Sequence, residues 1–451
     1  MKKNRTVPFV AAITVGMATM LGCAEDTPKD DAADQATVVW WGYAPDTSVG
    51  ELWAAEFMKD HPDIKVEYTN YENVDYAPAM EAAMQSGRGP DVFPVATGGV
   101  TGRELLGPYG MDLASIAEEE LGPLWKDQFG PGYVDQLTYD GAIVALPVGG
   151  VATGFFWINK DLFDTHGVST ELATYDDLKA ACETFGAAGV TCLTMGVASL
   201  DCFIIDLMHT ISQSYDHDYF LEAVLGERSF DDPTFVAILD KLREMLADGV
   251  FAQNVVSIKQ YPEANNEFLS GQAAMVHMGT WYAQYAKRDG MIASMEAAGV
   301  SNPTPFTMMP MASPDFAGDG HPAKPFGDVD YGMAINKDTK NLEAAKTFVL
   351  WLTSTKTGQQ TVVNAIDLLP ALTGVQPEWD NLGLVDPEIQ IPAFTELFDE
   401  GANPDGWRLM AITSETNNAL VVAAQRALSE PGASTAEIAK QAESEVFRTD
   451  F

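Results

Sequence analysis

Aromatic and acidic side chains that could hold a small polar molecule follow two predicted strands near the start of the chain. An apolar run at 38–41 precedes one group, and a second run at 91–95 leads into the loop 94–99. Helical patterns separate these runs, which predicts parallel strands in a doubly wound sheet, and such sheets bind ligands beyond the carboxyl ends of their strands. The candidates for ligand contact are Trp41, Tyr43, Asp46 and Thr97.

The stretch GAIVALPVGGVATGFFWINKDLF, from Gly141 to Phe163, would connect two such sheets. The residues 143–146 predict a short buried strand that Pro147 ends, and 155–158 predict a second strand rich in aromatic residues. The glycines between them tolerate backbone angles that other residues resist, so the chain can bend there or approach a ligand closely. We expect a hinge between two lobes at this point; an ordinary glycine turn between core strands is the alternative. The candidate ligand residues of this segment are Gly150 and Thr153.

Length and charge restrict the class of protein. A chain of 451 residues, 46% of them apolar and 20% charged, exceeds the usual size of one hydrophobic core, so two lobes are expected. The 26 Lys and Arg residues against 65 Asp and Glu give a formal charge of −39, which repels phosphate backbones, and no nucleic-acid partner is expected. The chain lacks a GxSxG elbow, an HExxH pair and a phosphate-binding loop, so no enzyme activity and no cofactor are expected.

The N-terminus is typical of an exported protein. Lys2, Lys3 and Arg5 precede an apolar run at 9–21, which predicts a secretory signal. The run ends in Met-Leu-Gly-Cys, which resembles the lipobox of bacterial lipoproteins except that methionine stands where leucine is usual, and this resemblance implies lipidation of Cys23. A plain secretory signal with an incidental cysteine is the alternative. The polar, acidic residues that follow, up to Ala36, are interpreted as a flexible tether.

Three further cysteines, Cys182, Cys192 and Cys202, allow at most one internal disulfide. A pair between Cys182 and Cys192 is favoured because a helix that packs on the next strand could bring them together, and three buried thiols are the alternative. None of the cysteine spacings is typical of a zinc site. The sequence Asp-His-Asp at 216–218 is interpreted as a solvated loop, so no metal site is expected.

Hydrophobic periodicity predicts the remaining elements. The expected helices cover 51–59, 76–86, 175–186, 203–214, 233–246, 265–269, 342–352, 389–398, 408–428 and 435–447. Further expected strands cover 64–68, 190–196 and 271–278.

Motifs in this order resemble the extracellular solute-binding proteins of ABC sugar importers, the family that contains maltose-binding protein. The similar segments are VVWWG, HPDIKVEY, MQSGRGPDVF, the stretch from Gly141 described above, FLSGQAAMVHMGTWY, YGMAINKDTKNLEAAKTFVLWLTSTKTGQQ and LLPA. The resemblance implies an α/β, two-lobed periplasmic-binding-protein-like fold of type II, in which each lobe is a doubly wound sheet flanked by helices and the ligand cleft lies between the lobes. The implied divisions are a signal peptide at 1–22, a tether at 23–36, lobe 1 at 37–150 plus 326–372, and lobe 2 at 151–325 plus 373–451.

The resemblance also nominates residues of the second lobe and of later crossings. It implies that Trp281 stacks on a sugar ring, whose apolar C–H face matches a flat indole; a core tryptophan is the alternative. Asp201 and Phe203 stand where the family presents a polar group and an aromatic ring, although an N-cap aspartate with a core phenylalanine is an equal interpretation. The other residues implied near the cleft, through a second hinge at 324–327 and the last helices, are Asp328, Asp330, Tyr331, Trp407 and Arg408. The aspartates are equally interpreted as turn formers, and Arg408 as the partner in a surface salt bridge.

The implied function is capture of a mono- or oligosaccharide by hinge closure and its delivery to the permease subunits of an ABC transporter. The protein would act as a monomer outside the cytoplasm, attached to the membrane by its N-terminal lipid. A binding protein for a non-sugar solute such as a polyamine is the alternative in the same class. A secreted glycoside hydrolase is less favoured, because 65 acidic residues place carboxylates in pairs by chance. A surface adhesin without a cleft is a third possibility.

Overall fold

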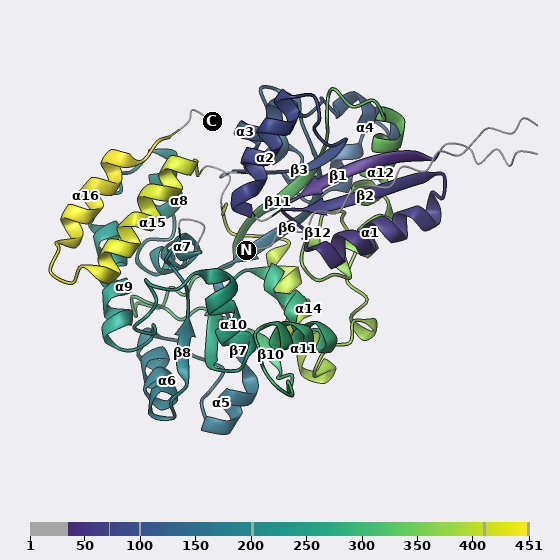
Figure 1. The fold of residues 1–451 in the computed structure, drawn as a ribbon. Coiled ribbons are helices and arrows are strands. Elements are labelled where there is room, and N and C mark those ends of the chain that lie inside the picture. Colours follow the sequence, from purple (N-terminus) through teal and green to yellow (C-terminus); the bar gives the residue numbers. More distant parts are fainter. Residues whose placement is uncertain (1–34, 72, 99–100, 200–202, 409–411, 449–451) are drawn as a thin grey trace, which may run out of the picture. The chain divides into compact units, whose positions relative to one another are not determined.

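The structure is a computed structural model that describes residues 35–448, apart from positions 72, 99–100, 200–202 and 409–411. The predicted signal, the lipidation site Cys23, almost all of the tether, and the residues Asp201 and Cys202 lie outside the described residues. Figure 1 shows the arrangement of the described helices and strands.

A six-stranded sheet carries the N-terminal candidates. Its strand order is β12-β6-β11-β3-β1-β2. The strands are β1 (Ala36–Gly42), β2 (Ile64–Asn70), β3 (Val92–Ala96), β6 (Leu146–Thr153), β11 (Phe326–Ile335) and β12 (Leu369–Pro370). β1 pairs in parallel with β2 and β3, which confirms the parallel pairing predicted from the strand–helix–strand pattern, whereas β11 and β6 pair antiparallel.

Helices cover this sheet with apolar side chains. They are α1 (Thr47–Asp60), α2 (Asn73–Gln85), α12 (Leu342–Ser354) and α13 (Lys356–Val363). The rings of Trp40 on β1 and Trp53 on α1 are stacked 6.3 Å apart, and Phe348 of α12 lies 5.5 Å from Trp40. All three side chains are fully buried, so this packing binds the helices to the strands.

A four-stranded sheet with the order β10-β7-β9-β8 forms the second body of the fold. The strands are β7 (Phe155–Asn159), β8 (Thr191–Thr194), β9 (Ala273–His277) and β10 (Met308–Ala312). The helices around it include α5 (Lys160–His166), α6 (Tyr175–Ala187), α7 (Ile204–Tyr215), α8 (Tyr219–Leu225), α9 (Pro233–Ala247), α15 (Ser414–Ser429) and α16 (Thr435–Glu445). α9, α15 and α16 pack on one another at one side of the fold (Figure 1). A further apolar cluster contains the helices α10 (Asn265–Leu269), α11 (Arg288–Ala297) and α14 (Pro387–Gly401).

Short elements complete the chain. They are α3 (Arg103–Leu106), η2 (Gly107–Tyr109), α4 (Ala114–Leu121), η3 (Trp125–Gln128), η4 (Asp135–Leu137), β4 (Thr138–Tyr139), β5 (Ala142–Ile143), η5 (Gln260–Ala264), η6 (Thr280–Ala286) and η7 (Trp379–Asn381).

The chain passes from one sheet to the other at Gly154. β6 belongs to the six-stranded sheet and β7, which begins one residue later, to the four-stranded sheet. Gly154 has φ = 103°, and a Cβ there would lie 2.8 Å from the carbonyl oxygen of Lys324, so only glycine fits. The chain returns between β10 and β11, and it leaves the six-stranded sheet again after β12 for α14, which packs on β10.

The prediction that Pro147 ends a short strand is wrong, because β6 continues through this residue to Thr153. Pro147 lies opposite Gly332 of β11, next to a shift of register between Tyr331 and Gly332. The neighbour on the other side, β12, pairs only with Gly149 and Gly150. An irregular, incompletely paired stretch tolerates the missing N–H of proline, and the sequence pattern alone does not report it.

The cysteine pairing is confirmed. Cys182 on α6 and Cys192 on β8 form a disulfide with their Cα atoms 5.0 Å apart. The helix expected at 408–428 is wrong at its start, since α15 begins at Ser414 and the side chain of Thr413 accepts the N–H of Thr416 as an N-cap. Arg408 therefore precedes this helix instead of standing in its first turn. No helix among the described residues has the length and apolarity needed to span a bilayer.

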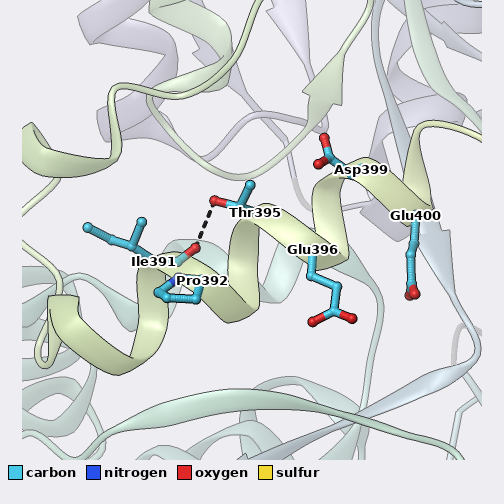
Figure 2. Close-up of a pocket in the computed structure, with 6 residues that line it drawn as sticks. All are labelled: Ile391, Pro392, Thr395, Glu396, Asp399 and Glu400. Carbon is cyan, nitrogen blue, oxygen red and sulfur yellow. Dashed lines mark hydrogen bonds between the residues drawn. The ribbon is translucent and has the colours of Figure 1, made fainter.

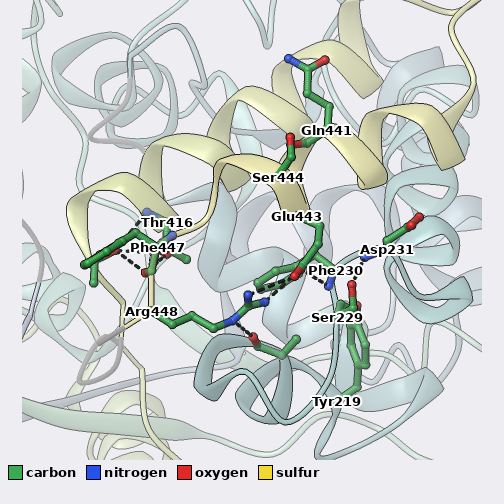
Figure 3. A network of polar contacts seen from close by, with 12 residues as sticks. Tyr219, Ser229, Phe230, Asp231, Thr416, Gln441, Glu443, Ser444, Phe447 and Arg448 are labelled. Atoms are coloured by element: carbon green, nitrogen blue, oxygen red, sulfur yellow. Dashed lines mark hydrogen bonds and ion pairs between the residues drawn. The ribbon is translucent and has the colours of Figure 1, made fainter. Parts of the chain in front are cut away.

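The end of the described chain is fastened to the four-stranded body (Figure 3). Arg448 forms an ion pair with Glu443 of α16 at 2.9 Å and donates a hydrogen bond to the carbonyl oxygen of Ala223 of α8. The hydroxyl of Thr416 accepts the N–H of Phe447 and donates to its carbonyl oxygen. These contacts hold α15 and α16 against α8.

Candidate ligand-binding site

Trp281 lies where the two bodies of the fold meet. It follows β9 by way of Gly279, as the expected strand at 271–278 implied, and its indole packs against the hydrophobic clusters of both the six-stranded sheet and α14. A Cβ at Gly279 would lie 2.0 Å from the indole ring, so glycine is needed to bring the ring over the turn. The hydroxyl of Thr280 accepts the N–H of Ala152 on β6 at 3.1 Å, which ties this turn to the crossing strand.

Aromatic rings and one guanidinium group surround Trp281. The Phe203 ring lies 5.4 Å away with an interplanar angle of 38°, and the guanidinium carbon of Arg408 lies 4.7 Å from the centre of the indole ring. Trp281 also donates a hydrogen bond to the Tyr261 hydroxyl. The structure therefore brings together three residues that the sequence predicted at this site, Trp281, Phe203 and Arg408.

Arg408 is held by a buried partner and not by the acidic surface. Its Nε donates to both carboxylate oxygens of Asp206 on α7 at 3.0 Å, and its Nη2 donates to Oδ2 at 2.9 Å. The side chains are only 8% and 4% exposed, so the alternative of a surface salt bridge is wrong. Burial raises the pKa of Asp206, while Arg408 opposes the rise. The pair fixes a cation on the face of Trp281.

A second aromatic group stands at the end of β1, as predicted. Trp41 lies 5.2 Å from the Tyr71 ring, and Tyr43 lies 5.2 Å from Tyr76 and 6.0 Å from Tyr331 of β11. Trp41 and Tyr43 keep part of their surface exposed. Burial and the charge of Asp330 raise the pKa of Tyr43, so this hydroxyl stays protonated and able to donate.

Tyr261 belongs to the aromatic group around Trp281, with its ring 6.1 Å from that of Phe203, and was missed by the sequence analysis. Its side chain keeps 40% of its surface exposed, yet desolvation by the surrounding protein raises its pKa well above the usual value. A ring that is both exposed and surrounded by protein is expected at a concave surface. Tyr261 also interacts electrostatically with Asp46 and Asp367, which belong to the six-stranded side of the fold.

Acidic side chains form the polar part of the same junction. Burial raises the pKa of Asp330 to about 6, and Asp328 adds to the rise while Arg408 opposes it. Burial, Asp330 and Asp46 raise the pKa of Asp367, whose Oδ1 accepts a hydrogen bond from Gln284 at 2.9 Å. Asp367 was not predicted, because it follows a helix and no periodic pattern distinguishes it.

The other predicted residues differ in their access to a ligand. Thr97 and Asp328 are each 3% exposed, and Thr153 and Tyr331 are fully buried. The space beside Gly150 is filled by Tyr133, whose hydroxyl would lie 2.0 Å from an added Cβ. Trp407 is 37% exposed and Asp46 is exposed. Asp201 lies outside the described residues.

A separate pocket of about 600 Å³ lies along one face of α14 (Figure 2). It is lined by Ile391, Pro392, Thr395, Glu396, Asp399 and Glu400. None of these residues was predicted to bind a ligand. Burial and the charge of Glu396 raise the pKa of Glu400, so the carboxylates of this face repel one another.

The described residues contain no group of three or more His, Cys, Asp or Glu side chains that could hold a metal ion. Within the loop 216–218, His217 contacts Asp218 at 2.8 Å and Asp405 at 3.3 Å, and Asp216 pairs with Arg228. These carboxylates point to different partners.

Residues 42–359 match the family of bacterial extracellular solute-binding proteins, which covers more than half of the chain. The chain belongs to this family. Similar members include an uncharacterized ABC transporter extracellular-binding protein of Pyrococcus horikoshii, 26% identical over 54% of this chain and 55% of the relative. A maltotriose-binding protein of Pyrococcus abyssi is 23% identical over 81% of this chain and 71% of the relative. The chain thus spans little more than half the length of the first of these relatives.

Solved structures of solute-binding proteins have the same fold. T. maritima MalE3 with bound maltose is similar with a TM-score of 0.70 and 20% identity over 91% of this chain and 98% of that one. A chitin oligosaccharide binding protein gives a TM-score of 0.70 and 20% identity over 92% and 98% of the two chains. The predicted α/β fold, the two-lobed type II periplasmic-binding-protein fold, is therefore confirmed.

Proposed function

We propose that this solute-binding protein captures a carbohydrate, a mono- or oligosaccharide, and delivers it to the permease of an ABC importer. The observation that carries the proposal is the position of Trp281, whose ring contacts the apolar clusters of both bodies and is bordered by Phe203, Tyr261 and Arg408. A flat ring matches the apolar face of a sugar, while polar groups around the ring match the sugar hydroxyls. Relatives named for maltotriose and maltose support the same ligand class.

The proposed mechanism is closure of two lobes around the ligand. Lobe 1 comprises 37–150 and 326–372, and lobe 2 comprises 151–325 and 373–451. A ligand that touches both lobes favours the closed arrangement by its difference in affinity for the two states. Gly154, which only glycine can occupy, is the proposed bending point of the first crossing.

The proposed ligand contacts combine both lobes. They are Trp41, Tyr43, Asp46, Thr97, Gly150, Thr153, Asp201, Phe203, Trp281, Asp328, Tyr331, Trp407 and Arg408. The exposed aromatic members supply the surface for the sugar, and the buried polar members, Tyr331 among them, supply hydrogen-bonding groups at the base of the site.

A thermal-shift screen against a panel of mono- and oligosaccharides tests the ligand class. A saccharide that binds the folded state raises the unfolding temperature in proportion to the logarithm of its concentration. X-ray scattering with and without that saccharide then tests closure, which should reduce the radius of gyration. An unchanged scattering curve at saturating ligand would refute closure, and the absence of any stabilising saccharide would refute the ligand class.

The same screen separates binding from hydrolysis. A solute-binding protein returns the saccharide intact after prolonged incubation, whereas a glycoside hydrolase releases shorter products. Chromatography of the recovered ligand decides between them, and we expect intact ligand.

We further propose that the protein is a monomer attached to the membrane through lipidated Cys23. The support is the lipobox-like sequence Met-Leu-Gly-Cys after an apolar run. Cys23→Ser should move the protein from the membrane fraction to the soluble extracytoplasmic fraction. Retention of the variant in the membrane fraction would contradict the anchor.

A further inference from the structure

Two aspartates converge at the hinge-proximal end of the proposed site. Asp330 lies in β11, where Val329 pairs with Gly150 and Tyr331 pairs with Gly149, so that Asp330 has no partner residue on β6. Such a bulge turns the extra side chain out of the regular alternation. Asp367, just before β12, interacts electrostatically with Asp330. β12 pairs with Gly149 and Gly150 from the other side of β6, so the register places Asp330 and Asp367 at the two strands that flank these glycines.

The Tyr331 hydroxyl is the third polar group of this cluster, because it interacts electrostatically with both carboxylates. The Tyr331 side chain is fully buried, and its Oη has no hydrogen-bond partner among the described residues. A buried hydroxyl without a hydrogen-bond partner lowers the stability of the folded protein, so its presence needs a physical reason. A hydrogen bond between Tyr331 and a bound ligand would provide that reason.

The cations near this cluster are already engaged. Arg408 directs its Nε and Nη2 to Asp206, and Lys287 donates its Nζ hydrogen bond to the carbonyl oxygen of Asn364 at 2.6 Å. Within the described part of the chain, the Asp330 carboxylate forms neither a hydrogen bond nor an ion pair within 4 Å. The cluster therefore offers acceptors and negative charge in excess of donors.

We propose that Asp330, Asp367 and Tyr331 bind a protonated amino group, so that the ligand is a saccharide with a free amine. This inference rests on the proposed carbohydrate function and narrows it. An ammonium group has three N–H donors and no acceptor, and two carboxylates and one phenolic oxygen provide three acceptors.

Proton release gives the proposal a signature that a neutral sugar does not share. Burial raises the pKa of Asp330 to about 6 and raises that of Asp367, with Asp328 and Asp46 adding to these rises and Arg408 and Lys287 opposing them. Tyr43 interacts electrostatically with Asp330, Tyr68 with Asp367, and Tyr331 with both, and burial raises the pKa values of all three hydroxyls, so they stay protonated near neutral pH. A bound ammonium group favours the ionised carboxylates, so its binding releases protons.

The experiment compares matched probes by isothermal titration calorimetry at pH 5.5, where the probe amines are protonated and the carboxyl of Asp330, with a pKa of about 6, is largely protonated before binding. The probes are the β-1,4-linked dimer and trimer of glucosamine, their fully N-acetylated counterparts, and cellobiose and cellotriose. We expect the free amines to bind at least tenfold more tightly than both counterparts. We also expect their binding enthalpy to differ between acetate and MES buffers, because the carboxyl groups release protons when the ammonium group binds.

Two substitutions test whether Asp330 and Asp367 cause the preference for free amines. Asp330→Asn and Asp367→Asn should each reduce the preference for the free amine to about twofold or less. Asp140→Asn is the matched control: this exposed residue lies in the β4–β5 turn with φ = 47°, which asparagine accepts, so one negative charge is removed far from the site. The control should keep the full preference. If a variant does not fold, the buffer dependence of the unaltered protein still decides the question.

Other results overturn the inference. N-acetylated or neutral saccharides that bind as tightly as the free amines would refute it and leave the proposed function intact. A preference for free amines that persists in both Asp330→Asn and Asp367→Asn would have the same consequence. Binding of free amines without any buffer dependence would also refute it. Failure of every saccharide to bind, both in this set and in the thermal-shift panel, would refute both the inference and the proposed function.

Discussion

Asp330→Asn should stabilise the ligand-free protein, by an amount that grows with pH. The ordinary pKa of an aspartate is 3.8, and burial raises that of Asp330 to about 6. A shift of roughly two units corresponds to about 3 kcal/mol of free energy at neutral pH. The folded protein binds the Asp330 proton more tightly than the unfolded chain does. Ionisation of this carboxylate therefore leaves the free energy of unfolding unchanged below pH 3.8 and lowers it by the full amount, about 3 kcal/mol, above pH 6.

The size of the effect follows from this difference. Between pH 4.5 and 7.5 the contribution of Asp330 to the free energy of unfolding should fall by about 2 kcal/mol. An asparagine does not titrate, so the variant lacks this loss. A chain of this length unfolds with an entropy of about 0.9 kcal/mol per kelvin, so the gain in Tm of the variant over the unaltered protein should increase by about 2 °C across that pH range.

Thermal denaturation at several pH values from 4.5 to 7.5 measures the difference. Asp140→Asn serves again as the control, and its Tm difference from the unaltered protein should not vary with pH. A Tm difference for Asp330→Asn that is independent of pH, or that shrinks as the pH rises, would refute the reasoning. A binding site whose charged groups lower the stability of the ligand-free protein is expected to show a Tm gain that increases with pH when one of these groups is neutralised.

Three further changes test other parts of the structure. Trp281→Ala should weaken saccharide binding by roughly 1.5–3 kcal/mol, about 10- to 150-fold in Kd, while the variant stays folded; equal affinity by calorimetry would remove Trp281 from the site. Asp206→Ala leaves Arg408 buried without its partner and should lower the free energy of unfolding by about 3–5 kcal/mol in denaturant titrations, whereas a loss below about 1 kcal/mol would show that water reaches the guanidinium. Replacing Cys182 and Cys192 together with alanine opens a loop of sequence separation 10 and should cost roughly 2–3 kcal/mol; unchanged stability would mean that the disulfide constrains the unfolded chain little.

The sequence was most informative where a single local rule controls the structure. Alternating and helical periodicities located the strands and helices because each reports which side of one element is buried. The crossing near Gly154 followed from the conformational tolerance of the glycines between two strands, and the pair Cys182–Cys192 from a helix packed on the next strand. These features depend on residues that are neighbours along the chain.

Local rules failed where pairing was irregular. Pro147 indicated the end of a strand, but a shift of register beside it lets β6 continue. The apolar residues after Arg408 extended a helical pattern that the N-cap at Thr413 interrupts. Both errors arose because hydrogen bonding by distant or side-chain groups changed the local preference.

The sequence by itself determined the class of fold, the export signature and the aromatic residues that stand at the ends of strands. Only the tertiary structure decided which polar groups meet: Asp206 and Arg408 are 202 residues apart in sequence, and Asp330, Asp367 and Tyr331 come together through the bulge in β11 and the short strand β12. The physical reason is that hydrophobic periodicity shows which face of a helix or strand is buried but not which residues pack against that face. The charge, protonation and free hydrogen-bonding capacity of the site therefore follow from packing alone.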